Sequence, residues 1–163
     1  MQESPDGTPA NRAWTAYTAF YLEAAPANEG AALWGLEGTW IDFITNFTHF
    51  GAPGASMIGN GRRDTWLIRN RLETTSETNR AAQICADKSL NGFNDWFLPS
   101  SGELNQLFEN RIAAGMPSDD FFWSSSQSSS TQAWLQDFVF GTRADMTKNN
   151  PHAPVLVRAI RAF

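Results

Sequence analysis

The sequence is poor in several features that would assign it to a particular class of protein. It has one cysteine, Cys85, among 163 residues, so no disulfide can form within the chain and cysteine usage does not mark it as secreted. Its longest apolar runs fall far short of the ~20 residues that a membrane-spanning helix needs. Charged residues are 18%, and 12 basic against 17 acidic side chains give a net charge of −5. General nucleic-acid binding needs clustered Lys and Arg, so this balance argues against it.

Aromatic residues are abundant by contrast. The chain has 12 Phe and 7 Trp but only 2 Tyr, together 13% of the sequence. Disordered chains are poor in aromatics, so this composition indicates a folded protein. Five tryptophans are expected to contribute to the core: Trp34, Trp40, Trp96, Trp123 and Trp134.

The N-terminal residues, 1–13, predict a flexible tail because they are rich in proline, glycine and polar residues. They lack the basic and apolar regions of a signal peptide. The sequence therefore predicts either no export by that route or a leader missing from this chain. Residues 14–163 have the length of one domain (~100–200 residues) and are predicted to form a single one.

The first half of that domain predicts a strand over residues 14–23 and a loop over 24–32. A helix is predicted to begin at Asp64 as N-cap, with Ile68 and Leu72 four residues apart on its apolar side. A second helix is predicted over residues 77–88.

The clearest local signal lies at Pro99-Ser100 and Glu103. Ser100 is followed three residues later by Glu103, the spacing of a reciprocal capping box, and Pro99 disfavours a helix before it. The pattern predicts a helix over residues 101–111. The apolar positions expected on its buried side are Leu104, Leu107, Phe108 and Ile112.

The C-terminal part predicts strands. Residues 121–123 are apolar and β-prone, and the serine-rich run 124–130 predicts a polar loop. A strand is predicted over 133–140 and irregular polar structure over 142–154. Residues 155–163 carry apolar side chains on both faces and predict a strand deep in a sheet. Helices in the middle and strands at the ends are an α+β pattern.

Few residues suggest chemistry. His49 and His152 have no neighbours with metal-ligand spacing, and neither HExxH, CxxC nor a phosphate-binding loop is present. Cys85 lies among small apolar residues and predicts a buried thiol. Asp119 and Asp120 leave calcium ligation and simple solvation both open. The lack of a catalytic motif favours a binding module.

Four arginines, Arg62, Arg63, Arg69 and Arg71, lie close together in the predicted first helix. They suggest either a local basic patch or an ordinary solvated helix face.

Several segments resemble one family. Residues 91–100, Asn-Gly-Phe-Asn-Asp-Trp-Phe-Leu-Pro-Ser, with Glu103-Leu104, resemble the signature G-x-x-D-W-x-L-P-(S/T)-x-x-E-L of the Legionella collagen-like protein C-terminal domain family. Other blocks agree in order: Tyr21–Pro26, Trp34-Gly35, Ile58–Gly61 with Thr65 and Ile68, Ala82 with Cys85, Phe122–Ser126, Ala133-Trp134, Phe138, Gly141 and Val157–Phe163. The resemblance spans about residues 14–163.

The resemblance implies a C-type lectin-like fold of the formylglycine-generating-enzyme branch, with helices packed around small antiparallel sheets. The chemistry of the signature residues themselves predicts that most of them are structural. These are Asp95, Trp96, Pro99, Ser100, Glu103, Trp123, Trp134 and Arg158. Trp96 and Leu98 are expected in the core. Asp95 is a candidate partner for Arg158 and Arg161, which need anionic or carbonyl partners on a buried strand.

Enzymes of that branch act through a pair of cysteines, and this chain has only Cys85. The resemblance therefore implies a non-catalytic ligand-binding module. Calcium occurs in the enzyme branch, but no ligands for it can be placed here, so no metal or cofactor is assigned. A protein or glycan ligand is expected, with neither nucleic-acid binding nor membrane insertion. A cell-surface or extracellular location is favoured.

Domains of this fold also serve as variable proteins of diversity-generating retroelements, in which a reverse transcriptase rewrites adenine-containing codons near the 3′ end of the gene. Residues 123–161 suit such a variable segment. The candidate ligand-binding residues are Gln127, Ser129, Gln132, Leu135, Asp137, Val139, Phe140, Thr142, Arg143, Asp145, Met146, Asn149, Asn150 and His152. Leu135, Val139 and Phe140 are either core residues or an exposed apolar patch near Arg143 and Asp145.

Two alternatives stay open from the sequence. One is an adhesive domain that binds glycans as a trimer and uses its Trp and Phe surface to form the oligomer. The other is an enzyme of the formylglycine-generating type, which would need a second thiol or a metal site.

Overall fold

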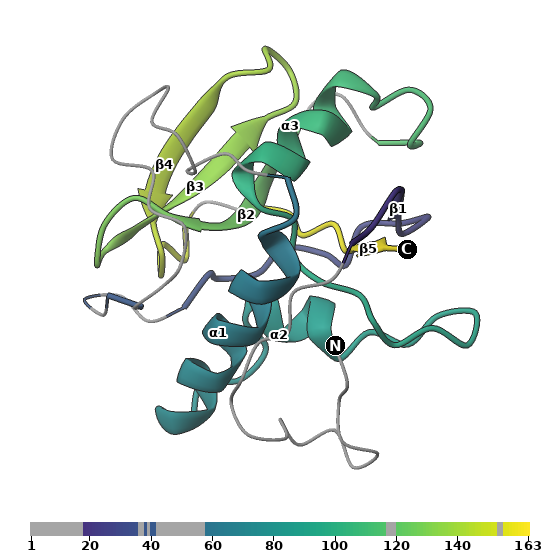
Figure 1. Cartoon of the computed structure of the whole chain (residues 1–163). Helices are drawn as coiled ribbons and strands as arrows, with labels where there is room; N and C mark the ends of the chain where they lie inside the picture. Colours follow the sequence, from purple (N-terminus) through teal and green to yellow (C-terminus); the bar gives the residue numbers. More distant parts are fainter. Residues whose placement is uncertain (1–17, 36–37, 39, 42–57, 117–119, 153–154) are drawn as a thin grey trace.

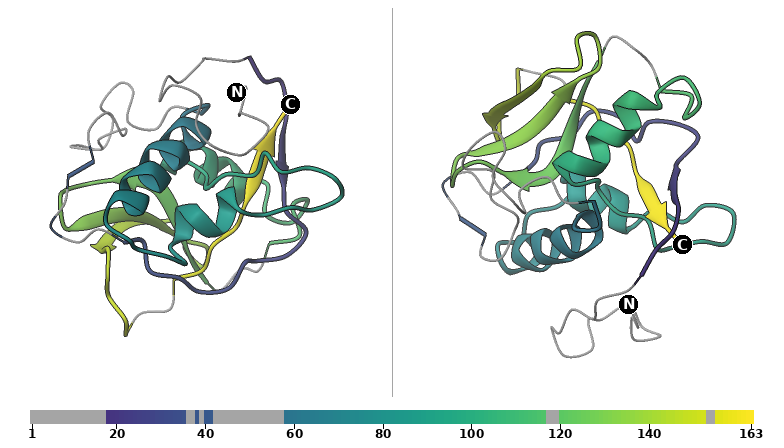
Figure 2. Two further views of the ribbon diagram at one scale, coloured as in Figure 1. Left: turned by 90° about the horizontal axis from the view of Figure 1, so that it is seen from below. Right: turned by 45° about the horizontal axis from the view of Figure 1, so that its top comes forward.

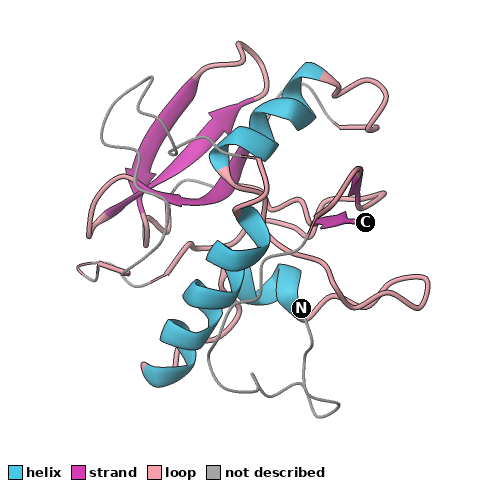
Figure 3. Cartoon of the chain, in the orientation of Figure 1, coloured by secondary structure: helices cyan, strands magenta, loops and turns pink. Residues whose placement is uncertain are grey.

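The computed structural model describes residues 18–35, 38, 40–41, 58–116, 120–152 and 155–163. The elements along them are β1 (Leu22–Ala24), α1 (Gly61–Thr74), α2 (Ala81–Ala86), α3 (Ser101–Glu109), β2 (Phe121–Gln127), β3 (Gln132–Asp137), β4 (Arg143–Thr147) and β5 (Ile160–Ala162). Figure 3 shows α3 between the two groups of strands and the other two helices below it, with long loops around them. This arrangement confirms the predicted α+β class with small antiparallel sheets.

Two antiparallel sheets organise the chain. β2, β3 and β4 form one, in that spatial order, and β1 pairs with β5 in the other. Leu22 lies opposite Ala162, so the first and last strands are neighbours (Figure 1). The predicted N-terminal strand is shorter and later than expected, and its residues 14–17 lie outside the described part. Of the predicted strand 155–163, only Ile160–Ala162 belongs to a sheet.

Residues 155–159 are nevertheless held on both sides. The Val157 N–H donates to the carbonyl of Gly30, and the Leu156 N–H donates to that of Phe121. Val155, Val157 and Ala159 are fully buried. The segment therefore connects the two sheets through the core, which explains its apolar residues on alternate faces.

The first two helices differ from prediction at their ends. α1 begins at Gly61, and Asp64 is a buried residue of its first turn whose N–H donates to the Asn60 carbonyl, so Asp64 is not the N-cap. Ile68 and Leu72 are buried as predicted. α2 covers only Ala81–Ala86, because Asn79 adopts a positive φ of 57° and breaks the helix before it.

α3 begins at the predicted capping box. The Ser100 side chain accepts from the Glu103 N–H, and the Glu103 carboxylate accepts from the Ser100 N–H at 2.7 Å. The helix ends at Glu109, and Ile112 lies beyond it with 91% of its surface exposed. Ile112 is therefore not on the buried side of the helix as predicted.

The serine run is mostly strand, not loop. Ser124, Ser125 and Ser126 are fully buried in β2. The Ser124 hydroxyl donates to the Trp134 carbonyl, and the Ser126 hydroxyl accepts from the Ser101 N–H. Main-chain partners satisfy the Ser124 and Ser126 hydroxyls, and the small size of the three serines lets the start of α3 approach β2 closely. Composition alone does not reveal either effect.

Two apolar clusters form the core. The larger contains Trp34, Trp96 and Trp123 together with Cys85, and the smaller joins α3 to β2 and β5. The views in Figure 2 show α3 between the three-stranded sheet and the β1–β5 pair. Trp40 is 39% exposed and Trp134 is partly buried, so these two contribute less to the core than predicted.

A polar cluster centred on Lys148 lies inside the larger core region. The Lys148 ammonium is buried, donates to Gln127 Oε1 at 3.0 Å and lies 4.6 Å from the Trp34 ring centroid. The Gln127 side chain also donates to the Ile41 carbonyl at 2.7 Å. Burial lowers the pKa of Lys148 to about 8. The cluster ties the end of β4 to the N-terminal half of the chain.

Lys148 predicts a specific dependence of stability on pH. Its pKa is about 8 in the folded chain and ~10.4 in an unfolded one, so between these values the unfolded state binds more protons and stability rises with pH. Relative to Lys148→Met, the native chain should gain roughly 2–3 kcal/mol between pH 7.5 and 10. Urea unfolding at several pH values measures this difference.

Both the native protein and the Lys148→Met variant keep Cys85. Burial raises the pKa of its thiol well above the usual value. A raised thiol pKa means that stability is lost at high pH, and this loss cancels between the two chains. A difference between native and Lys148→Met stability that stays flat over the range would contradict the prediction.

Candidate functional site

Exposed apolar side chains gather at the turn between β3 and β4. Phe140 is 79% exposed and Val139 47% exposed, and Phe121, opposite Asp137 across the β2–β3 ladder, is also exposed. We call Phe121, Val139 and Phe140 the hairpin patch. Figure 1 shows the turn beside the C-terminal end of α3. The structure thus places Val139 and Phe140 outside the core, in a turn and not on a strand.

The Asp137 carboxylate closes this turn. Its Oδ1 accepts from the Val139 N–H at 2.6 Å and from the Phe140 N–H at 3.3 Å, and the Gly141 N–H donates to the Asp137 carbonyl. An aspartate that binds backbone two and three residues ahead is a standard turn-forming device. Asp137 is buried. It therefore positions the exposed side chains and is not available to contact a ligand as predicted.

The turn is also anchored to α3. Gly141 has a φ of +73° and lies so close to the Phe108 ring that a Cβ there would overlap it. The Gln136 side chain donates to the Gly141 carbonyl and to Asn105 Oδ1, each at 3.1 Å. Phe138 packs edge-on to Phe108 at 5.5 Å between ring centroids. The hairpin patch is consequently held on a rigid support.

Charged side chains of both signs border the patch. The Arg111 guanidinium lies 4.4 Å from the Phe108 ring centroid. Arg143 begins β4 and is partly buried, which lowers its pKa, while nearby Glu109 opposes that shift. Exposed aromatics beside arginines inside a polar border are the composition of protein-binding hot spots.

The other predicted ligand residues do not converge at this turn. Thr142 and Arg143 lie next to it, and Asp145 and Met146 follow along β4. The remainder lie at the opposite end of the sheet, about 17 Å away for a five-residue strand: Ser129, Gln132, Asn149, Asn150 and His152. One contiguous sequence segment therefore supplies two separate surfaces.

Two further predicted ligand residues are interior. Leu135 is 2% exposed and lies opposite Trp123 in the core, which decides between the two alternatives left open for it. Gln127 is fully buried in the Lys148 cluster. Neither side chain reaches a surface where a ligand can bind.

The residues expected to be structural make internal contacts. The Arg161 guanidinium bonds Glu23 at 2.6 Å and lies 3.6 Å from Asp95. Asp95 is thus near Arg161 and not paired with Arg158, whose guanidinium donates to the Asn28 side chain and to a main-chain carbonyl. Trp96 and Leu98 are buried as expected, and Pro99 carries the carbonyl that accepts from the Ser125 N–H.

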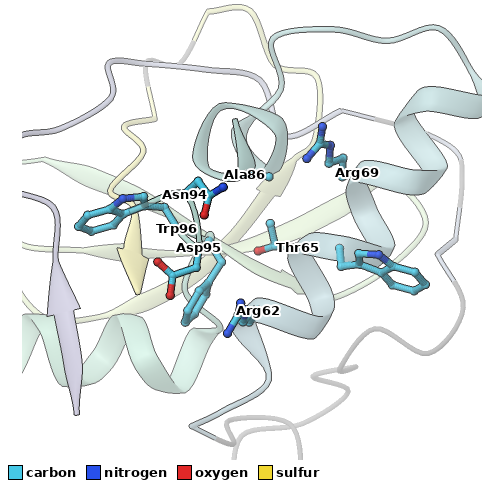
Figure 4. A pocket seen from close by; sticks show the side chains of 9 residues that line it. Arg62, Thr65, Arg69, Ala86, Asn94, Asp95 and Trp96 are labelled. Carbon is cyan, nitrogen blue, oxygen red and sulfur yellow. The ribbon is translucent and has the colours of Figure 1, made fainter. Parts of the chain in front are cut away.

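A small pocket separates α1 from the loop before Trp96. Figure 4 shows Arg62, Thr65 and Arg69 on one side of it and Asn94 and Asp95 on the other. Its volume is about 30 Å³, room for one or two waters. It is too small for a sugar or peptide side chain.

Carboxylates form ion pairs with arginines of α1 and so offset their positive charge. Arg69 pairs with Glu73 and Asp87, and Arg63 pairs with Asp64. These contacts favour the solvated helix face over the basic patch.

The described residues offer little for catalysis. Within them, no group of three or more His, Cys, Asp or Glu side chains could hold a metal ion. The Cys85 thiol is fully buried, and burial raises its pKa, so it is a poor nucleophile. No helix in the described ranges has the length and apolar character needed to cross a bilayer.

Comparison with known protein families shows which family this chain belongs to. The family model of the Lcl C-terminal domain matches residues 60–161. The chain belongs to the Lcl C-terminal domain family. The match includes the three helices, the β2–β4 sheet and the hairpin patch, and it confirms the family resemblance of the sequence.

A solved structure shares the fold. A fimbrial protein from Bacteroides ovatus ATCC 8483 superposes with a TM-score of 0.59 at 15% sequence identity. The alignment covers 87% of this chain and 35% of the fimbrial protein, so the chain spans about a third of that protein. Among curated proteins, none matches the sequence.

The support of the hairpin patch can be tested separately from the patch itself. Asp137→Ala leaves two turn N–H groups without their acceptor and should destabilise the chain by about 1–3 kcal/mol. Phe140→Ser changes an exposed side chain and should alter stability by less than about 0.5 kcal/mol. Urea unfolding compares them, and equal losses for the two variants would argue against the assigned roles.

Proposed function

We propose that this chain is a non-catalytic ligand-binding module with a C-type lectin-like fold, and that residues 123–161 present its ligand surface. The observation that carries the proposal is the hairpin patch. Hydrophobic side chains at a solvent-exposed turn lose the favourable free energy of burial. Here, however, a buried aspartate, a glycine and a glutamine hold these side chains outward. Contact with a partner accounts for such an arrangement.

The fold assignment to the formylglycine-generating-enzyme branch is supported by the order of elements. The first and last strands pair, helices lie between them, and a separate three-stranded sheet carries the C-terminal segment. Catalysis of that branch's type is disfavoured because the single thiol, Cys85, is buried. We therefore assign the module no enzymatic activity, metal or cofactor.

A protein ligand fits the patch better than a glycan. Phe140 and Val139 offer apolar contact area with arginines beside it, the composition of a protein hot spot. A glycan site would need several hydrogen-bonding side chains converging on one pocket, and the polar candidates are spread over both ends of the sheet. Since a fimbrial protein shares the fold, we propose a cell-surface adhesive role.

The ligand surface is also proposed to be diversified by a retroelement. Exposed positions such as Val139, Phe140, Thr142 and Asp145 tolerate changes of chemistry because they touch little of the core. Asp137 and Gly141 would stay constant because they build the turn. A fixed support with replaceable exposed side chains is the physical requirement for such a system.

The retroelement origin makes a prediction about DNA. A near-copy of the segment encoding about residues 123–161 should lie close to the gene, beside a reverse-transcriptase gene, with differences confined to adenines. Codon differences should fall on the exposed positions of the sheet and spare Asp137 and Gly141. Sequencing the flanking DNA checks this, and a flank without such a repeat removes the retroelement origin but leaves ligand binding.

The ligand surface is tested by a matched pair of substitutions. The labelled chain is applied to a protein array and a glycan array, alongside Phe140→Ser and Phe93→Ser. Phe93 is a 43% exposed aromatic side chain in the turn before Trp96, outside the hairpin patch. Signals on the protein array should fall at least about tenfold with Phe140→Ser and persist with Phe93→Ser.

Signals on the glycan array alone would show that the ligand is a glycan and not a protein. Signals that survive Phe140→Ser on both arrays would place the ligand surface away from the hairpin patch.

A further inference from the structure

The outer edge of β1 has backbone groups that find no partner among the residues the structure describes. Tyr21 and Phe163 exchange N–H to carbonyl bonds at 3.0 and 3.1 Å, and the Ala25 N–H donates to Ala159 at 2.9 Å. In an antiparallel pair such bonds recur at every second residue. The N–H and carbonyl groups of Leu22 and Ala24 therefore point away from β5, and nothing in the described ranges bonds to them. Figures 1 and 2 show β1 at the outside of the molecule.

A hollow lies beside this open edge. Its volume is about 330 Å³, within the ~300–1,000 Å³ of ligand pockets. It is lined by residues 18–22, Ile58, Gly59, Glu103 and Ala162. Leu22 and Ala162 are cross-strand partners that pack on the smaller core cluster. The hollow thus continues that core to the place where a further strand would lie.

The opposite face of β1 carries charge. The Glu23 carboxylate bonds Arg161, and 45% of its side-chain surface remains exposed. Tyr21 is exposed beside it, with its ring 5.8 Å from that of Phe163. A side chain next to Glu23 on an added strand would meet an acidic and aromatic surface.

We propose that an extended segment of another polypeptide adds a strand to the open edge of β1. Leu22 and Ala24 supply two N–H donors and two carbonyl acceptors to its backbone. Strand addition of this kind draws affinity from the main chain and specificity from pockets for alternate side chains. The residue opposite Leu22 enters the hollow, and the residue opposite Glu23 lies on the other face.

The surroundings define the chemistry of that segment. The hollow is lined by polar as well as apolar groups, among them Leu22, Ile58 and the buried carboxylate of Glu103, so an uncharged residue with apolar surface fits it and an acidic one is repelled. Glu23 favours a basic residue at the neighbouring position. The net charge of −5 also disfavours a second copy of this chain and favours a basic partner.

Peptide selection on the full 163-residue chain tests the proposal. A phage library of random nonapeptides is selected on the native chain and counter-selected on Ala24→Pro. Proline at position 24 removes an N–H that the β1–β5 ladder does not use and is tolerated on a sheet edge. Selected peptides should alternate apolar and basic residues, and should bind the native chain at least about tenfold more tightly than Ala24→Pro.

Two further variants keep the result independent of the folding of Ala24→Pro. Ala162→Leu fills the hollow and leaves the backbone edge intact, so it should weaken the same peptides about tenfold. Glu23→Lys should reverse the preference from basic to acidic residues. Phe140→Ser should leave peptide affinity unchanged, which separates this edge from the hairpin patch. Peptides that ignore the substitutions at positions 24, 162 and 23 would overturn the proposal.

Amide hydrogen exchange measured by NMR gives a direct readout. The Leu22 and Ala24 amides of the free chain should exchange rapidly and become protected when a selected peptide binds. Protection in the free chain at every concentration would show that the chain covers its own edge. Protection that grows with protein concentration would show a second copy there. Either result would contradict the proposal that a segment of another polypeptide binds at this edge.

Discussion

The buried carboxylate of Glu103 is the interaction on which the arrangement of the helices depends. It accepts the N–H groups of Gly59 and Ser100 at 2.8 and 2.7 Å, and that of Gly61 as well. The starts of α1 and α3 therefore meet at one negative charge, which the positive ends of both helix dipoles stabilise. Burial raises the pKa of Glu103 and these bonds counteract that shift. A side chain at Gly61 would overlap the carboxylate, so glycine is required there.

The position of α3, set by Glu103, in turn determines how the C-terminal sheet packs. Glu103 sets the start of α3, whose first residue bonds Ser126 of β2 and whose Phe108 contacts the β3–β4 turn. The exposed Val139 and Phe140 are therefore positioned by a continuous set of contacts that begins at two helix termini. Preorganisation of this kind lowers the entropy lost when a partner binds. It also explains how a loop-rich chain can present apolar side chains in a defined geometry.

The molecule has two surfaces of different character on separate sheets. At the hairpin patch, side chains supply the contact area and the N–H groups of Val139, Phe140 and Gly141 are bonded within the turn. At β1, the backbone itself is open and a hollow lies beside it. The first surface can change its chemistry by substitution without loss of the support beneath it. The second depends on strand geometry and tolerates little change. A module that varies at one surface and keeps the other constant can attach to one partner while it recognises different ligands.

The sequence by itself determined the features whose cause is local. The capping box of Ser100 and Glu103, the α+β order of elements and the burial of Cys85 follow from spacing and composition within a few residues. Membership of the family was also visible in short motifs. The sequence further located the exposed Val139 and Phe140 as candidates, although it left their burial open.

Only the tertiary structure decided which polar residues are interior and which exposed residues share a surface. The serine run looked like loop because serine is polar, but carbonyl and N–H groups from distant segments satisfy Ser124 and Ser126 inside the core. Asp137 resembled a ligand contact because the bonds that make it a turn residue are invisible without the backbone. The open edge of β1 can be identified only from the pairing of β1 with β5, a strand nearly 140 residues away in the sequence. Long-range hydrogen bonding and packing, which carry no local pattern, account for each of these differences.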